Sequence, residues 1–224
     1  MAAVSAREAA YQKLRGRIIR MELKPGDALN DRELAEEMGI SRTPVREAII
    51  MLNLAHMVTI KPQSGTHVAP IDLKLMEMEQ FARFTLEKEM LCRIRGRLTA
   101  EQAAGYRALM EQYDQLYQST RSVERDNRLL EMDNAFHRRA FELNGMEAHF
   151  DHLLSSFQHI ERLRMFSLMS GENMTVVREH TRILEAVLHG RTEDVERALN
   201  AHLSRYKISV EEARRKNPEY FIEG

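Results

Sequence analysis

The chain has 224 residues, of which 43% are hydrophobic and 30% are charged, and its formal net charge is −1. This composition is typical of a globular protein with a substantial core, and it excludes a protein that binds nucleic acid through overall basicity. No apolar run reaches the roughly 20 residues that span a bilayer, and the N-terminus lacks the apolar stretch of a signal peptide. Cys92 is the single cysteine, so no internal disulfide can form. We therefore expect a cytoplasmic protein with no membrane partner.

The first predicted element is an amphipathic helix over residues 5–21. Its apolar side is expected to hold Ala9, Leu14, Ile18 and Ile19. Five basic residues lie largely outside that side: Arg7, Lys13, Arg15, Arg17 and Arg20. They form either a solvated face or a set of phosphate contacts, and the pattern leaves both open. The Pro-Gly pair at residues 25–26 then predicts a turn.

The stretch from residue 29 to residue 57 predicts two short helices joined by a tight turn. Asn30 and Glu33 have capping-box spacing at the start of the first helix, residues 31–38, and Gly39 suits its left-handed end. Ser41 can cap the second helix. The apolar residues recur at helical spacing and can form one shared core: Leu34, Ala35, Met38, Ile40, Val45, Ala48, Ile49 and Leu52.

Polar residues near the start of the second helix point away from that core. In a helix-turn-helix these positions enter the DNA major groove, where Arg and Thr suit guanine, phosphate and the thymine methyl. The pattern alone also fits an ordinary helical hairpin. A short predicted hairpin follows, in which residues 58–60 and 67–68 flank a Gly-containing loop that can lie against the minor groove or backbone. The candidate DNA-contacting residues are Arg32, Ser41, Arg42, Thr43, Arg46, Gly65 and His67.

The run RELAEEMGISRTPVREAI resembles the N-terminal winged helix of GntR-type bacterial transcription regulators. The resemblance extends from about Tyr11 to Val68 and includes SGTHV, which corresponds to the wing. It implies a winged helix-turn-helix domain over residues 1–70 that binds a double-stranded DNA operator. His56 departs from the family, which usually has a glycine there, but histidine tolerates the left-handed conformation better than most residues.

Beyond Pro70 the sequence predicts six helical segments, at about 72–96, 99–119, 122–143, 146–169, 173–189 and 192–216. Glycines mark several joints, and Thr99 with Gln102 has capping-box spacing. The predicted fold is therefore mainly α, with an N-terminal winged helix-turn-helix followed by an all-α six-helix bundle over residues 71–224.

This bundle resembles the FCD ligand-sensing domain of FadR-like GntR regulators, closest to the VanR-like six-helix group. The matching motifs are Arg83-x-x-Leu86-Glu87, Asp133-x-x-Phe136-His137, Glu179-His180 and His202-Leu203. The resemblance implies a homodimer on a palindromic operator, most often a repressor, that responds to a small carboxylate effector and contains a metal. We therefore expect the protein to regulate transcription by binding DNA, and not to catalyse a reaction.

Asp133 and His137 are four residues apart, so they share one face of a helix. His180 and His202 share a face with apolar neighbours on two later helices. An inward histidine is more often an ordinary core residue, but all four positions agree with the metal-binding pattern of the resembled family. One carboxylate and three imidazoles suit a divalent transition metal such as Zn, Ni, Co or Mn.

Three arginines are candidate effector-binding residues. Arg83 is expected to orient a carboxylate bidentately, although a structural ion pair with Glu87, four residues on, is an equal alternative. Of Arg162 and Arg164, one is expected to face the cavity, and the sequence does not say which.

Three other readings of the bundle stay open. Residues His149, His152 and His159 form a rival metal group, for which packing or solvent exposure is the preferred interpretation. A metallohydrolase-like bundle whose N-terminal domain only contacts protein is the alternative from another functional class. A DNA-binding protein whose bundle serves only for dimerisation, with a vestigial metal site, is the third.

Overall fold

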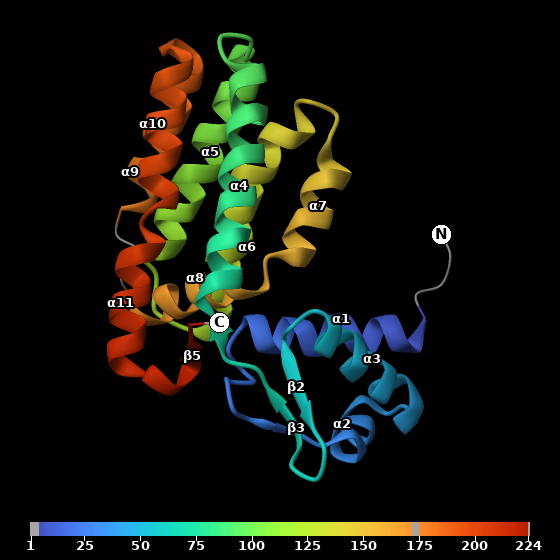
Figure 1. The fold of residues 1–224 in the computed structure, drawn as a ribbon. Helices are drawn as coiled ribbons and strands as arrows, with labels where there is room; N and C mark the ends of the chain where they lie inside the picture. Colours follow the sequence, from blue (N-terminus) through green and yellow to red (C-terminus); the bar gives the residue numbers. More distant parts are fainter. Residues whose placement is uncertain (1–4, 172–174, 224) are drawn as a thin grey trace.

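A computed structural model describes residues 5–171 and 175–223 of the chain (Figure 1). A small N-terminal part contains α1, α2, α3 and a three-stranded sheet, and a larger helical part stands on it. The first helix, α1 (Ala6–Ile19), lies between the two parts, where it packs against α8 (Gln158–Ser170).

The N-terminal part has the predicted winged helix-turn-helix arrangement. Its helices α2 (Asp31–Met38) and α3 (Arg42–Leu54) precede the hairpin of β2 (Val58–Lys61) and β3 (Gly65–Val68). A short strand that we did not predict, β1 (Ala28–Leu29), pairs antiparallel with β3, so the sheet order is β1-β3-β2. Two residues give no periodicity signal, which explains why the sequence pattern missed this strand.

Local chemistry sets the ends of these helices. The side chain of Asn30 accepts hydrogen bonds from the backbone amides of Arg32 and Glu33, and Gly39 ends α2 at a φ of 67°. Ser41 occupies the N-cap of α3 without a side-chain capping bond. His56 adopts the left-handed conformation expected of it, with a φ of 56°.

The shared core of this part is formed by α1 packing on α3. Leu14 and Ile18 of α1 are fully buried, as are Val45 and Leu52 of α3. The prediction was wrong for Ala9, which is exposed; its neighbour Ala10 is buried instead, because it lies four residues before Leu14 on the face that meets α3.

The helical part contains the remaining helices. They are α4 (Leu73–Ile94), α5 (Ala100–Tyr117), α6 (Val123–Glu142), α7 (Glu147–Ser156), α8, α9 (Val176–His189), α10 (Thr192–Leu203) and α11 (Tyr206–Lys216), followed by a 3-10 turn (Pro218–Tyr220) and β5 (Phe221–Ile222). The first two residues of the predicted 173–189 segment, 173–174, lie outside the described residues.

Two predicted segments are each divided into two helices. Between α7 and α8, the Glu79 carboxylate accepts hydrogen bonds from the backbone amides of residues 158–160, which caps a new helix start. Between α10 and α11, the buried Gln80 side chain donates to the Leu203 carbonyl oxygen at 2.6 Å. Both breaks therefore depend on α4 side chains that lie far away in sequence.

The connection between the two parts also takes part in a strand pair. A two-residue strand, β4 (Ile71–Asp72), precedes α4 and pairs parallel with β5 near the C-terminus, a contact that we did not predict. Arg15 of α1 adds a hydrogen bond to the Leu154 carbonyl oxygen at 2.8 Å. Among the described residues, no helix is long and apolar enough to cross a bilayer.

Two leucines of α3 provide a matched test of this core. Leu52 is 0% exposed and Leu54 is 74% exposed. Leu52→Ala should lower the free energy of unfolding by about 2–5 kcal/mol, because it removes buried methyl groups and leaves a cavity. Leu54→Ala should change it by less than about 0.5 kcal/mol in the same urea titration. Equal effects would contradict the packing of α3.

Candidate metal centre

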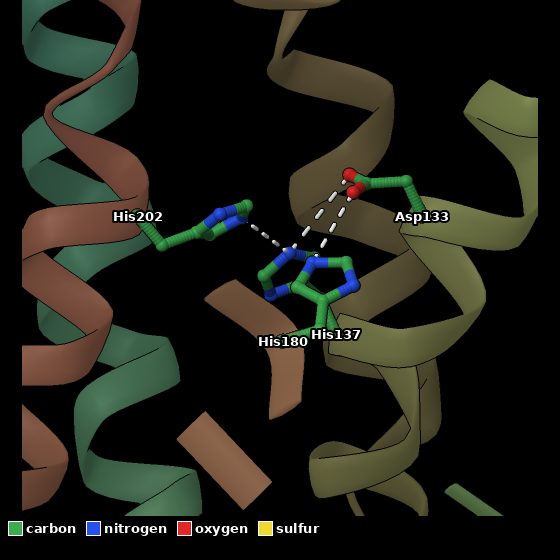
Figure 2. Close-up of side chains that lie close together, drawn as sticks. All are labelled: Asp133, His137, His180 and His202. Carbon is green, nitrogen blue, oxygen red and sulfur yellow. Dashed lines mark hydrogen bonds and ion pairs between the residues drawn. The ribbon is translucent and has the colours of Figure 1, made fainter. Parts of the chain in front are cut away.

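Three helices bring one acidic and three imidazole side chains together inside the bundle (Figure 2). Asp133 and His137 come from α6, His180 from α9 and His202 from α10. One potential ligand atom from each lies within 4.8 Å of all the others. Asp133, His137 and His180 are buried, and His202 is nearly so. The structure therefore brings together the four residues that we predicted from sequence.

The ligand atoms face a common point. His180 Nε2 lies 3.2 Å from Asp133 Oδ1, and His137 Nε2 lies 3.9 Å from Asp133 Oδ2. His137 Nε2 and His202 Nε2 are 3.2 Å apart (Figure 2). Three ring nitrogens and one carboxylate are the donors that a borderline divalent metal prefers.

Outer carboxylates orient two of the rings. His137 Nδ1 lies 2.7 Å from Glu87 Oε2, and His202 Nδ1 lies 2.9 Å from Glu179 Oε2. A carboxylate beside Nδ1 favours the proton on that nitrogen, which leaves the Nε2 lone pair directed inward. Two inward lone pairs 3.2 Å apart repel unless a proton or a cation lies between them. The arrangement therefore fits a metal.

His180 provides a second indication. Its Nε2 lies close to Asp133 but without the alignment of a hydrogen bond, so among the described residues this buried atom has no hydrogen-bond partner. Its ring is stacked on Phe136, with ring centres 3.9 Å apart, which fixes the direction of the nitrogen. A buried polar atom without a partner is costly, and a metal would satisfy it.

The charge states also suit ligation. Burial lowers the pKa of His137 to about 4 and that of His180 to about 3, so both rings are neutral at pH 7. Burial alone would raise the pKa of Asp133, but Arg164 and His180 outweigh it and hold that pKa well below its ordinary value. Neutral imidazole and ionised carboxylate are the forms that bind metal.

The candidate effector arginines occupy different places. Arg83 lies in the bundle with its Nε 2.7 Å from Glu87 Oε1, and both side chains are buried. Arg164 is hydrogen-bonded to Asp133 and Glu161. Arg83 and Arg164 both line a cavity that also reaches Asp133 and His202. Arg83 is thus both an ion-pair partner and a cavity residue.

This cavity has a volume of about 70 Å³. Its lining combines charged, polar and apolar residues. Its wall includes Gln80, Tyr113, Leu130, Ile160, Leu163, Ser167, Leu168, Val176, Glu179, Leu203, Arg205, Tyr206 and Ser209. A small anion with an apolar or hydroxylated remainder matches such a wall.

Arg162 lies elsewhere, and the expectation that it belongs to the effector site is corrected. It is fully buried and donates hydrogen bonds to the carbonyl oxygens of Ala69 at 2.6 Å and Pro70 at 3.3 Å. Residues two apart on a helix point in nearly opposite directions, so only one of Arg162 and Arg164 can face the cavity. His159 also lies with Arg162, and the rival histidine group forms no metal cluster among the described residues.

Sequence reasoning did not assign the outer carboxylates to the centre. Glu179 immediately precedes His180, yet it contacts His202 of the next helix. Arg205 contacts Glu179 at 3.4 Å, and Thr175 Oγ1 donates to it at 2.7 Å. The available signal was the Glu-His pair itself, since a metal-bound histidine usually has a carboxylate on its other nitrogen.

The candidate DNA-contacting residues form a separate surface at the N-terminus of α3. Arg42 lies 2.9 Å from Asp31 of α2, and Arg46 is paired with the same carboxylate. These two arginines hold the pKa of Asp31 below its ordinary value. Arg32 is paired with Glu36, while Ser41 and Thr43 are exposed.

The wing lies beside this surface. Gly65 is exposed at a φ of 88°, and His67 of β3 is partly exposed. A groove of about 520 Å³ runs between the wing and α3, and its lining includes Arg46, Gly65 and His67. A recognition helix beside a wing, with Arg46 in the groove between them, suits double-stranded DNA.

Comparison with known proteins bears on both parts of the chain. Residues 6–68 match the family described as "Bacterial regulatory proteins, gntR family", and residues 80–205 match the FCD domain. The chain belongs to the GntR family. It is a ligand-responsive, DNA-binding transcription regulator of the FadR-like group, and its families and relatives are regulators rather than enzymes. FCD domains often bind a metal.

Relatives of this GntR regulator cover most of its length. The HTH-type transcriptional regulator LutR of Bacillus subtilis is 31% identical over 200 residues, covering 82% of this chain and 91% of LutR. The HTH-type transcriptional repressor RspR of Escherichia coli is 29% identical over 217 residues, covering 95% of this chain and 92% of RspR. The solved structure of E. coli McbR/YncC shares the fold, with a TM-score of 0.74 at 18% identity. The match covers 94% of this chain and 100% of the McbR chain.

The low pKa values of His137 and His180 predict acid sensitivity of chelator-treated protein. Between about pH 6.5 and pH 4 the unfolded chain binds more protons than the folded chain, so the free energy of unfolding falls as the pH falls. At pH 5 each ring accounts for about 2 kcal/mol. Urea unfolding at pH 7 and pH 5 measures the loss, and His180→Gln should lose less. An identical loss in the variant would contradict the assignment.

Proposed function

We propose that this GntR regulator is a homodimeric repressor acting in the cytoplasm, with a divalent transition metal held by Asp133, His137, His180 and His202. The observation that carries the proposal is the convergence of three imidazole nitrogens and a carboxylate oxygen within 4.8 Å in a buried setting. Zn, Ni, Co and Mn all suit this donor set. The metal would supply open coordination positions for an anionic ligand.

The effector proposed here is a small organic acid. Arg83 and Arg164 line the cavity beside Asp133, and guanidinium groups bind carboxylate through paired hydrogen bonds. Their own partners, Glu87 and Glu161, hold the two guanidinium groups in place before a ligand arrives. The chain's role is therefore to orient the acid and to exclude water from it.

For DNA, we propose that Arg42 and Arg46 contact bases or phosphates, with Ser41, Thr43, Arg32 and the wing residues Gly65 and His67 adding contacts. Asp31 holds both arginines near the groove in the structure, and phosphate would take its place. Two winged helices of a dimer would read the halves of a palindromic operator. Repression is supported by the similarity to RspR, a transcriptional repressor of Escherichia coli that is 29% identical.

The acid would act by binding one arrangement of the two domains better than the other. It shifts the DNA-competent population only by that difference in affinity. A bundle that serves only for dimerisation would leave three buried imidazoles and their outer carboxylates without a role, which favours the sensor over that alternative.

Elemental analysis of protein purified without an affinity tag tests the metal. Wild type should contain about one metal per chain, and His180→Ala should contain far less because a ligand is gone. His189→Ala is the matched control, since His189 ends the same helix with its side chain 73% exposed. Wild type without metal, or equal metal in all three proteins, would contradict the proposed centre.

Thermal melting with acetate, lactate, succinate and citrate tests the effector site on the same proteins. At least one acid should raise the melting temperature of wild type and of His189→Ala, but not that of His180→Ala, since ligands stabilise the state that binds them. Equal shifts in all three proteins would place acid binding outside the metal centre.

Binding to duplex DNA at several salt concentrations tests the recognition helix. Arg46→Ala should weaken binding, by about 1–3 kcal/mol if Arg46 contacts a base, or reduce the salt slope by about one unit if it contacts phosphate. Arg93→Ala is the control, because Arg93 is similarly exposed and ion-paired but lies on α4. Unchanged affinity and slope in Arg46→Ala would overturn the DNA-binding assignment.

A further inference from the structure

The C-terminal segment of the chain, residues 206–222, lies beyond the part that matches the FCD domain, which ends at residue 205. It consists of α11, the 3-10 turn and β5, and it returns the chain to the junction between the two domains (Figure 1). One end of this segment lines the effector cavity, and the other end pairs with the domain junction.

The first end begins beside the metal centre. Tyr206 and Ser209 of α11 line the cavity together with Arg83 and Arg164. Arg205, the residue before α11, contacts Glu179, which in turn lies 2.9 Å from the Nδ1 of His202. The start of α11 is thus coupled through Glu179 to the orientation of a candidate metal ligand.

The other end is bound to β4. Ile71 pairs with Phe221 and Asp72 pairs with Ile222 in a parallel two-stranded sheet. Phe221 is 8% exposed and belongs to one apolar cluster with Ile71, Ile160 and Leu163. Ile160 and Leu163, unlike Phe221, also line the effector cavity, so the cluster that holds β5 adjoins the cavity wall.

The junction itself has little freedom. Strand β3 of the wing ends at Val68, and Arg162 of α8 binds the next two carbonyl oxygens, of Ala69 and Pro70. The backbone amide of Asp72 donates to His159 at 3.0 Å. A displacement of β4 would therefore reach the wing within a few bonded residues, without a flexible linker to absorb it.

We propose that residues 206–222 form a strap through which the occupied effector cavity changes the position of the DNA-binding domain. This inference rests on the proposed function and adds the part of the ligand site that senses the acid. The end of the acid remote from its carboxylate contacts Tyr206 and Ser209, α11 moves with it, and β5 transmits the movement to β4 and so to the wing. The strap contacts the effector cavity at one end and the domain junction at the other, so a continuous set of packed elements connects the cavity to the wing.

Adjacent β5 residues offer a matched pair of variants in the full-length protein. Phe221→Ala removes the buried anchor of β5, whereas Ile222→Ala changes a side chain that is 46% exposed on the same strand. The probes are the acid that raises the wild-type melting temperature most and a duplex that the wild-type protein selects from random-sequence DNA. The DNA dissociation constant is measured with and without the acid, beside metal content.

Acid should change the DNA affinity of wild type and of Ile222→Ala by the roughly 5- to 150-fold typical of allosteric coupling. Phe221→Ala should keep its metal and its melting shift with acid, yet its DNA affinity should change less than about 2-fold. A full DNA response in Phe221→Ala would overturn the strap. A wild type that binds no acid would overturn the proposed function itself, and this inference with it.

If Phe221→Ala does not fold, amide hydrogen exchange on the wild-type protein tests the strap instead. Addition of the acid should change exchange in peptides that cover residues 69–72 and 218–222 together, because the two strands share hydrogen bonds. A change confined to the cavity helices, with both of these peptides unaffected, would overturn the strap.

Discussion

Buried charge is the constraint on which the helical domain depends. Arg83 and Glu87 of α4 form an ion pair with both side chains at most 5% exposed, and Arg164 of α8 bonds the carboxylate of Asp133 of α6, whose side chain is 10% exposed. Removing such charges from water is expensive unless each has a partner in good geometry. Arg164 and Asp133 link α8 to α6, and Glu87 and His137 link α4 to α6, so these contacts restrict the relative positions of the three helices.

The same network accounts for the kind of ligand that the cavity suits. Four carboxylates surround the centre (Glu87, Asp133, Glu161 and Glu179), against three guanidinium groups (Arg83, Arg164 and Arg205). A divalent cation among neutral imidazoles would turn this small negative excess into a small positive one. An acid anion would then restore neutrality in a site that is shielded from water. In the proposed centre, metal and carboxylate would therefore favour each other's binding for an electrostatic reason.

The features that were predictable from sequence depend on local or periodic signals. The caps at Asn30 and Gly39, the wing hairpin and the shared α6 face of Asp133 and His137 all follow from spacings of a few residues, whereas the metal assignment rests on the family resemblance. The features that were missed depend on partners distant in the chain. Glu79 divides one predicted helix by capping residues about 80 positions away, and β4 exists only because β5 lies beside it. Helical periodicity likewise placed Arg162 and Arg164 on one helix without deciding which side of it faced the cavity.

The placement of Arg162 and Arg164 on opposite sides of α8 has a structural consequence. Two arginines two residues apart on α8 have opposite tasks, since Arg164 binds a candidate metal ligand and Arg162 binds the chain that leads to the wing. A helix moves as a rigid unit over such a short distance, so a shift at Arg164 is also a shift at Arg162. Because α8 packs on α1 as well, the DNA-binding domain contacts the helical part through the same helix that carries Arg164 beside the candidate metal centre. One turn of α8 therefore contacts both the candidate metal centre and the chain that follows the wing, and the proposed strap pairs with that same stretch of chain through β4.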